Sequence, residues 1–130
     1  AIRGLAIDHL ARHHSDPAEL VSVRVRRLLA ELVGTTGHAL HDVARLMDTH
    51  PRTLQRALAA EGTTYELVLD DVRRVTALRL ITTTDLRLTQ IATVVGFSAQ
   101  SALSRAVRRW TGMAPRQLRA SDEIPATMSR

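Results

Sequence analysis

The stretch LTQIATVVGFSAQSALSRAVRRWTGMAPRQLR, from Leu88 to Arg119, decides the fold of this chain. Its first half has the pattern of two short helices that meet at a tight turn. Gly96 stands where such a turn needs a positive φ, and Ser98 is in position to cap the second helix. Apolar residues recur at helical spacing on both sides of the turn. The stretch therefore predicts a helix-turn-helix.

The predicted second helix has a polar face opposite its apolar one. Ala102, Leu103 and Ala106 are spaced to face inward, which leaves the polar side chains on the outside. Such side chains hydrogen-bond well to base edges and phosphates, so DNA binding is the leading hypothesis, and a merely solvated helix face is the plainer alternative. Arg108 and Arg119 are further candidates for phosphate contacts. The side chains that we assign to DNA here are Ser98, Gln100, Ser101, Ser104, Arg105 and Arg109.

A second copy of the pattern lies 48 residues upstream, in DVARLMDTHPRTLQRALAAEG. At this offset Asp48 matches Gly96 and Leu54 matches Ala102. Pro51 suits the first turn of a helix, where its missing N–H is not needed. Two such copies in one chain are far less expected by chance than one. The side chains that we assign to DNA in this copy are Arg52, Thr53, Gln55 and Arg56.

Two longer fragments resemble the two halves of a known domain. They read PRTLQRALAAEGTTYELVLDDVRRVTALRLI from Pro51 and IATVVGFSAQSALSRAVRRWTGMAPRQLR from Ile91. Over residues 21 to 120 or so the chain resembles the DNA-binding domain of the AraC/XylS family of bacterial transcription regulators. The resemblance implies an all-α fold of seven helices, with two helix-turn-helix subdomains joined by a long linker helix.

The same resemblance implies a function and partners. It implies sequence-specific binding of double-stranded promoter DNA, with two recognition helices in adjacent major grooves on one face of the duplex. Separately from the resemblance, we expect RNA polymerase as a further partner and expect the chain to be monomeric on DNA. We also expect a cytoplasmic location, with which the absence of cysteine is compatible.

The chain departs from the family pattern in both halves. Asp48 stands where the first turn usually has glycine, and we expect it to tolerate the left-handed geometry. His50 replaces the usual serine cap, and we expect it to be the poorer cap. Leu103, Val107 and Leu118 fill positions that are usually aromatic, which accounts for an aromatic content of only 2%.

Other local signals predict helix ends and subdomain limits. Asp16 and Pro17 predict a helix start, with the helix continuing to Val33. A threonine at 63 or 64 caps the long helix, which reaches Thr82, and Thr82 to Asp85 forms a hinge-like polar break. The apolar surface of the long helix is predicted to come from Tyr65, Leu69, Val72, Val75, Leu78, Leu80 and Ile81. The predicted organisation is a linker or upstream remnant at 1–16, subdomains at 17–62 and 85–120, the linker helix at 63–84 and a tail at 121–130.

Composition agrees with this interpretation. An apolar fraction of 45% in 130 residues suits a helical core. All 18 basic residues are arginine, a bias that genome composition explains better than function does, but the net charge of +5 favours a polyanionic partner. The chain has no cysteine, no apolar run long enough to span a membrane and no signal-peptide pattern. Because it begins at Ala1, we expect a fragment whose effector-sensing domain lies upstream.

Two other classes of function find little support in the sequence. His9 and His13, or His38 and His41, have helical spacing, but no cysteine or carboxylate joins either pair at ligand spacing, so we predict no metal and no cofactor. No nucleophile stands beside a base in a known motif, so we predict no enzymatic activity. A helical protein-interaction domain that does not bind DNA remains the alternative hypothesis.

Overall fold

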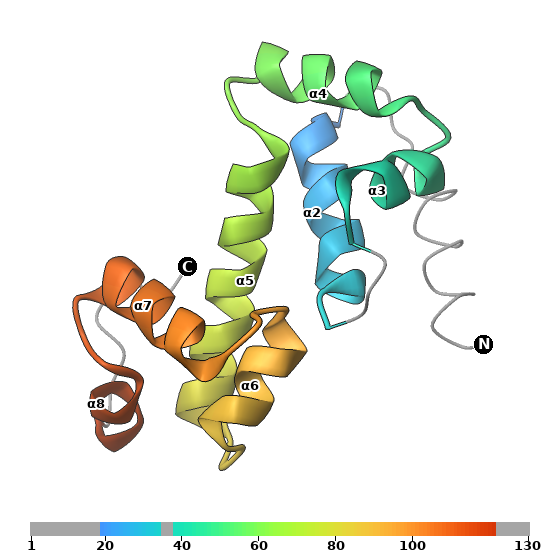
Figure 1. Ribbon diagram of the computed structural model, residues 1–130. Helices are drawn as coiled ribbons and strands as arrows, with labels where there is room; N and C mark the ends of the chain where they lie inside the picture. The colour runs from blue at the N-terminus through green and yellow to red at the C-terminus, as the bar shows by residue number, and fades with distance from the viewer. Residues whose placement is uncertain (1–18, 35–37, 122–130) are drawn as a thin grey trace. The chain divides into compact units, whose positions relative to one another are not determined.

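The computed structural model describes residues 19–34 and 38–121, and within these ranges it contains seven helices and no strand (Figure 1). The predicted all-α fold class is thereby confirmed. The helices are α2 (Val21–Leu32), α3 (Leu40–Leu46), α4 (Pro51–Ala60), α5 (Tyr65–Thr83), α6 (Leu88–Val95), α7 (Gln100–Thr111) and α8 (Pro115–Ala120). The chain divides into two compact units, one extending to Val72 and the other starting at Arg73, so α5 contributes residues to both.

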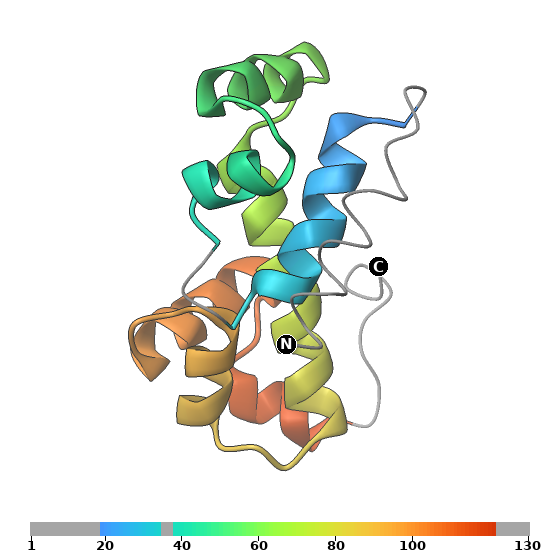
Figure 2. The ribbon, with the colours of Figure 1, turned by 90° about the vertical axis from the view of Figure 1, so that its right-hand side faces the viewer.

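The first unit has a core formed by α2, α3, α4 and the first half of α5. Its helices α2, α3 and α4 contact one another, as the two views of Figures 1 and 2 show. The hydroxyl of Tyr65 donates a hydrogen bond to the carbonyl of His38 and so ties the start of α5 to the segment before α3. The buried residues are Val25, Leu28, Leu29, Leu32, Val33, Val43, Ala44, Leu54, Leu58, Tyr65, Val68 and Val72.

Helix α2 begins later than its sequence predicts. The prediction was a start at Pro17 with Asp16 as the cap, but these two residues lie outside the described ranges and α2 begins at Val21. Leu20 occupies the N-cap position and cannot provide a side-chain acceptor. The carboxylate of Glu61 does so instead, because it accepts hydrogen bonds from the backbone N–H groups of Val21 (2.6 Å) and Ser22 (3.0 Å). The end of α4 therefore caps the start of α2.

The second unit packs the remainder of α5 against α6, α7 and α8. Leu103, Val107 and Leu118 are all fully buried, so aliphatic side chains fill the positions where the family usually has aromatic ones. Phe97 and Trp110 pack at the margin of this core and remain partly exposed. Other buried members of the core are Ala77, Leu78, Ile81, Ile91, Ala92 and Val95.

Helix α5 buries different sides along its length. In its first half, burial follows a helical repeat through Tyr65, Val68 and Val72. The next buried positions are Ala77, Leu78 and Ile81, which start a second repeat on another side of the helix. Val75, which we predicted to supply apolar surface, falls between the two repeats and is 41% exposed. The prediction for Val75 was wrong because one apolar stripe cannot describe a helix that serves two cores.

The predicted polar break after α5 begins later than its sequence indicates. Thr82 and Thr83 belong to α5, and only Thr84 and Asp85 lie beyond it. The hydroxyls of all three threonines donate to carbonyls one turn back, with distances of 2.8, 2.6 and 2.6 Å to Leu78, Arg79 and Leu80 respectively. These bonds give all three hydroxyls acceptors within the last turns of the helix itself.

Candidate nucleic-acid interface

Both units contain the same tight turn after the first helix of a pair. In the first unit the backbone N–H of Thr49 donates to the carbonyl of Ala44 (2.9 Å), and in the second Phe97 donates to Ala92 (2.8 Å). The residue before each donor has a left-handed backbone. It is Gly96 with φ of 93° in the second unit and Asp48 with φ of 54° in the first. The predicted repeat is confirmed as far as this turn, and so is the predicted tolerance of aspartate for its geometry.

The repeat changes register after the turn. Leu54 is buried, but Ala102, which lies 48 residues further on, is only half-buried, whereas Leu103 is fully buried. Leu58 likewise corresponds in burial to Val107. From the turn residue to the helix start there is one more residue in the second unit than in the first, so the equivalent positions on α4 and α7 differ by 49. The predicted match of Leu54 with Ala102 was therefore wrong.

Helix α4 starts with an imidazole cap. His50 is the N-cap residue and Pro51 is the first helical residue. The Nδ1 atom of His50 accepts a hydrogen bond from the backbone N–H of Arg52 at 3.1 Å. Histidine thus takes the place of the usual serine, and it does so only in a form with Nδ1 unprotonated.

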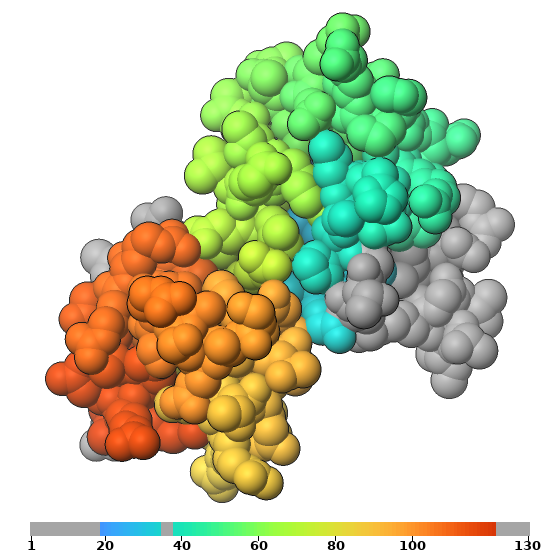
Figure 3. Space-filling view, in the orientation of Figure 1, coloured from blue at the N-terminus to red at the C-terminus, as the bar shows by residue number. Residues whose placement is uncertain are grey.

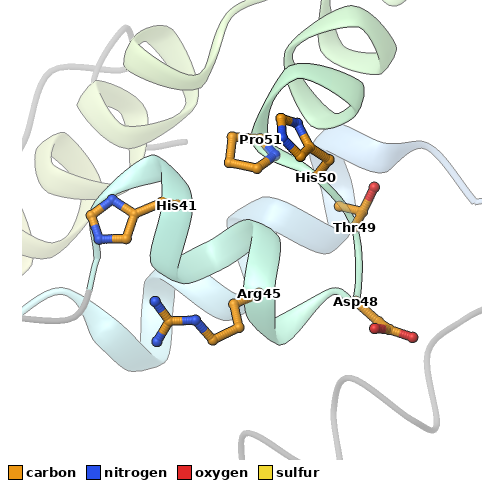
Figure 4. A pocket seen from close by; sticks show the side chains of 6 residues that line it. All are labelled: His41, Arg45, Asp48, Thr49, His50 and Pro51. Carbon is orange, nitrogen blue, oxygen red and sulfur yellow. The ribbon is translucent and has the colours of Figure 1, made fainter.

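A shallow cleft lies at the same turn (Figure 4). Its side chains come from α3, from the turn and from the start of α4. Asp48 brings a carboxylate to a group of otherwise basic or neutral side chains. The lining residues are His41, Arg45, Asp48, Thr49, His50 and Pro51.

The predicted contact residues of α4 all lie on its outer face. Arg52, Thr53, Gln55 and Arg56 are exposed, while Leu54 and Leu58 face the core. In Figure 3 the green side chains of this helix lie at the surface of the first unit. The helix is held by its two leucines and, at its far end, by the hydrogen bonds from α2 to Glu61.

The predicted contact residues around α7 are more varied in exposure. Ser101, Arg105 and Arg109 are exposed, whereas Gln100 and Ser104 are half-buried. The guanidinium of Arg109 lies over the ring of Trp110, 5.5 Å from its centroid. Ser98 does not cap this helix as predicted. Ala99 is the N-cap, and Ser98 is an exposed residue of the turn because the turn is one residue longer here.

Arg73 supports the second helix-turn-helix from α5. Its Nε donates to the carbonyl of Val95 (3.2 Å) and its Nη2 to that of Gly96 (3.4 Å). The same guanidinium lies over the Phe97 ring, 5.3 Å from the centroid. A cation at these carbonyls is favourable because they form the negative end of α6. Sequence reasoning missed this role, since the partners are 22 and 23 residues apart.

Two further findings bear on other kinds of site. Among the described residues there is no group of three or more metal-ligating side chains, and His9 and His13 lie outside those residues. None of the helices from α2 to α8 is long and apolar enough to cross a membrane.

Comparisons with known proteins agree on the class of protein that this chain resembles. A family model described as a helix-turn-helix domain matches residues 43–121. The HTH-type transcriptional regulator VirS of Mycobacterium tuberculosis is 41% identical over 116 residues, which are 89% of this chain and 34% of VirS. The ornithine utilization regulator of Pseudomonas aeruginosa is 45% identical over 104 residues, 80% of this chain and 30% of that protein. The chain thus spans about a third of the length of these relatives.

Solved structures share the fold. The C-terminal domain of AraT, a response regulator from Geobacillus stearothermophilus, matches with a TM-score of 0.70 at 25% identity, covering 85% of this chain and 93% of that domain. The DNA-binding domain of AdpA, a global transcriptional factor solved in complex with a target DNA, matches with a TM-score of 0.64 at 23% identity. That match covers 78% of this chain and 92% of the AdpA domain, and it concerns the fold alone.

Proposed function

The chain belongs to the AraC-type helix-turn-helix family of DNA-binding transcription regulators, and from this premise we propose that α4 and α7 each enter a major groove of double-stranded DNA. The two grooves are successive ones on one face of the duplex. A single chain then recognises two short sequence elements without forming a dimer.

One observation carries this proposal: both units present a polar face on the second helix of the same turn. At the offset of 49, Arg52 is equivalent to Ser101, and Gln55 to Ser104. Arg56 is equivalent to Arg105, and both arginines are exposed. Equivalent exposed positions on two recognition helices are the ones that base edges would contact.

The side-chain types suggest a division of roles. Arginine pairs best with the two acceptors of guanine in the major groove, so we assign base contacts to Arg56 and Arg105. Gln55 has the donor and acceptor that adenine requires. The hydroxyls of Thr53, Ser98, Ser101 and Ser104 suit either bases or phosphates, while Arg52 and Arg109 supply charge for the backbone.

The test uses a duplex selected from a random library by the chain itself. Arg56→Ala and Arg105→Ala are each expected to lower affinity for this duplex by about 1–3 kcal/mol and to relax base preference in one element each. Arg79→Ala is the matched control, because Arg79 is an exposed arginine on α5 that the proposal does not use. If both variants weaken random DNA as much as the selected duplex, the base-reading role is wrong. If no duplex is selected at all, the alternative of a protein-interaction domain gains support.

Three finer points belong to the same proposal. The chain is monomeric on DNA, since it carries both recognition helices. The full-length regulator acts in the cytoplasm, where bacterial DNA lies. RNA polymerase is its further partner, and co-purification of the polymerase with the full-length regulator on promoter DNA tests that point.

A further inference from the structure

The second unit has a cleft where three of its helices begin. Helix α6 starts at Leu88, α7 at Gln100 and α8 at Pro115, and residues at each of these starts line the cleft. Figure 2 shows the three helices of this unit, in orange to red, from a second side. The polar lining comes from Arg87, Thr89, Gln100, Arg116 and Arg119.

The cleft is strongly basic. Three of its lining residues are arginines, and none of the lining residues is acidic. Arg87 and Arg116 are exposed, so their guanidinium groups can turn toward a ligand. Helices α6 and α7 also lack a side-chain acceptor at their N-cap residues, Arg87 and Ala99. Their first-turn N–H groups therefore add partial positive charge to that of the arginines.

Arg119 is a fixed cation in the wall of this cleft. Its Nε donates to the carbonyl of Ile81 at 3.0 Å, which holds the guanidinium in position. Its Nη2 is buried and has no hydrogen-bond acceptor among the described residues. A buried donor left in this state costs free energy. The charge of this guanidinium attracts an anion in the cleft, although Nη2 itself stays without an acceptor.

Gln100 belongs both to the cleft and to the proposed recognition helix α7. It lines the cleft and is also the first residue of α7, one turn before Ser104. At the offset of 49 it is equivalent to Pro51, not to any of the exposed residues of α4. It is also half-buried. These properties suit a contact with the DNA backbone beside the bases that α7 faces.

We propose that this cleft binds one backbone phosphate of the DNA, held by Arg87 and Arg116 with the charge of Arg119 behind it. This rests on the proposed function of α7. The phosphate holds the start of α7 close to the duplex, whichever bases lie beside it. Arg87 and Arg116 thus act in positioning and affinity, not in the choice of sequence.

The first experiment measures the salt dependence of binding to the selected duplex. Neutralising one phosphate accounts for a slope of about 0.9 in log affinity against log salt concentration. Arg87→Ala and Arg116→Ala are therefore each expected to reduce the slope by about 0.9. Each should also weaken binding at low salt by about tenfold, as the loss of one charge-assisted hydrogen bond predicts. The preference for the selected over a scrambled duplex should not change.

Two comparisons sharpen this measurement. The double variant should lose no more slope than either single variant, because the phosphate contact needs both arginines and is already lost when one of them is removed. Arg79→Ala removes the same charge from an exposed site in the same unit, and it should leave the slope nearly unchanged. Unaltered circular dichroism and Trp110 fluorescence check that the variants fold. The proposal is overturned if Arg87→Ala or Arg116→Ala has the same salt slope as the unmodified chain. It is also overturned if the double variant loses about twice as much slope as each single variant.

The second experiment titrates the chain with inorganic phosphate, without DNA, and follows backbone amides by NMR. Phosphate should shift the amide signals of Thr89 and Ser101, and Arg116→Ala should weaken this response. If phosphate shifts the amide signals but the variants leave the salt dependence of DNA binding unchanged, the cleft is a site for small anions. The proposal that its ligand is a DNA phosphate is then overturned. No shift and no change in slope would overturn the site altogether. If no duplex is selected, the proposed function fails by itself, and the phosphate titration still tests the cleft.

Discussion

Replacing Glu61 with glutamine should destabilise the first unit, because one carboxylate caps a helix that begins 40 residues earlier. In the native chain the two carboxylate oxygens accept from Val21 and Ser22 separately. Glutamine retains one acceptor, loses the second and removes the negative charge from the start of α2. The substitution therefore changes the hydrogen bonds while nearly preserving the shape of the side chain.

The expected magnitude follows from these two bonds. A hydrogen bond to a charged group contributes about 1.5–3 kcal/mol, and loss of a helix cap costs about 0.5–2 kcal/mol. Glu61 is partly exposed, so solvent reduces the effect, and we expect the free energy of unfolding to fall by about 1–2 kcal/mol. For a unit of this size each kcal/mol lowers Tm by about 4–8 °C.

The loss should also depend on pH. Burial raises the pKa of Glu61, but hydrogen bonds from Ser22 and Val21 lower it more, so that the pKa lies below its ordinary value of 4.5. A carboxylate with a depressed pKa stabilises the folded state above the ordinary value, and this stabilisation is lost as the pH falls through the folded pKa. The difference between the native chain and Glu61→Gln should thus be complete at pH 7 and should shrink below pH 4.5.

Thermal unfolding by circular dichroism at pH 7 and at pH 3.5 tests this reasoning. Glu31→Gln is the control, because it makes the same chemical change within α2 but away from the helix start. Hydrogen exchange of the Val21 and Ser22 amides adds a local measurement, and both should exchange faster in Glu61→Gln. The reasoning is refuted if Glu61→Gln is as stable as Glu31→Gln at pH 7, or if the loss is the same at both pH values.

Three other predictions concern the recognition units. His50→Ala should destabilise the first unit by about 0.5–2 kcal/mol in chemical denaturation, whereas His50→Ser, which restores a hydroxyl cap, should not. Arg73→Ala removes the cation from the end of α6 and should lower the Trp110-monitored unfolding midpoint, while Arg79→Ala leaves it unchanged. Footprinting of the chain should give an asymmetric site, with two elements separated by about 10 bp and one chain bound per site. Two chains on a palindrome would contradict the last of these.

Local sequence signals determined most of the helices and both turns. Gly96 and Gly112 end helices with positive φ, Pro115 begins one, and Asp48 replaces a glycine in the left-handed region. Thr64 caps α5, as one of the two predicted alternatives, by accepting from the N–H of Leu67 at 3.1 Å. These features depend on residues within a few positions of one another, so their side-chain types alone specify the backbone.

The sequence predicted the register of the two helix-turn-helix units only up to the turn. The offset of 48 held as far as the turn, where it is fixed by the bond between Phe97 and Ala92 and its counterpart in the first unit. It failed beyond the turn, because a polar residue such as Ser98 fits equally well as a cap and as one more residue of the loop. The burial of Leu103 settles the register, and burial depends on the core around it.

Only the tertiary structure decided which distant groups meet. The sequence contains Glu61, but its use as the cap of α2 depends on α4 ending beside the start of α2. Val75 is exposed because α5 serves two cores, a fact that no periodicity within the helix itself contains. Arg87, Arg116 and Arg119 lie up to 32 residues apart and meet in one cleft because α6 and α8 pack in the same unit. Helices form from contacts between near neighbours in the chain, whereas caps, supports and clefts come from the packing of helices against one another.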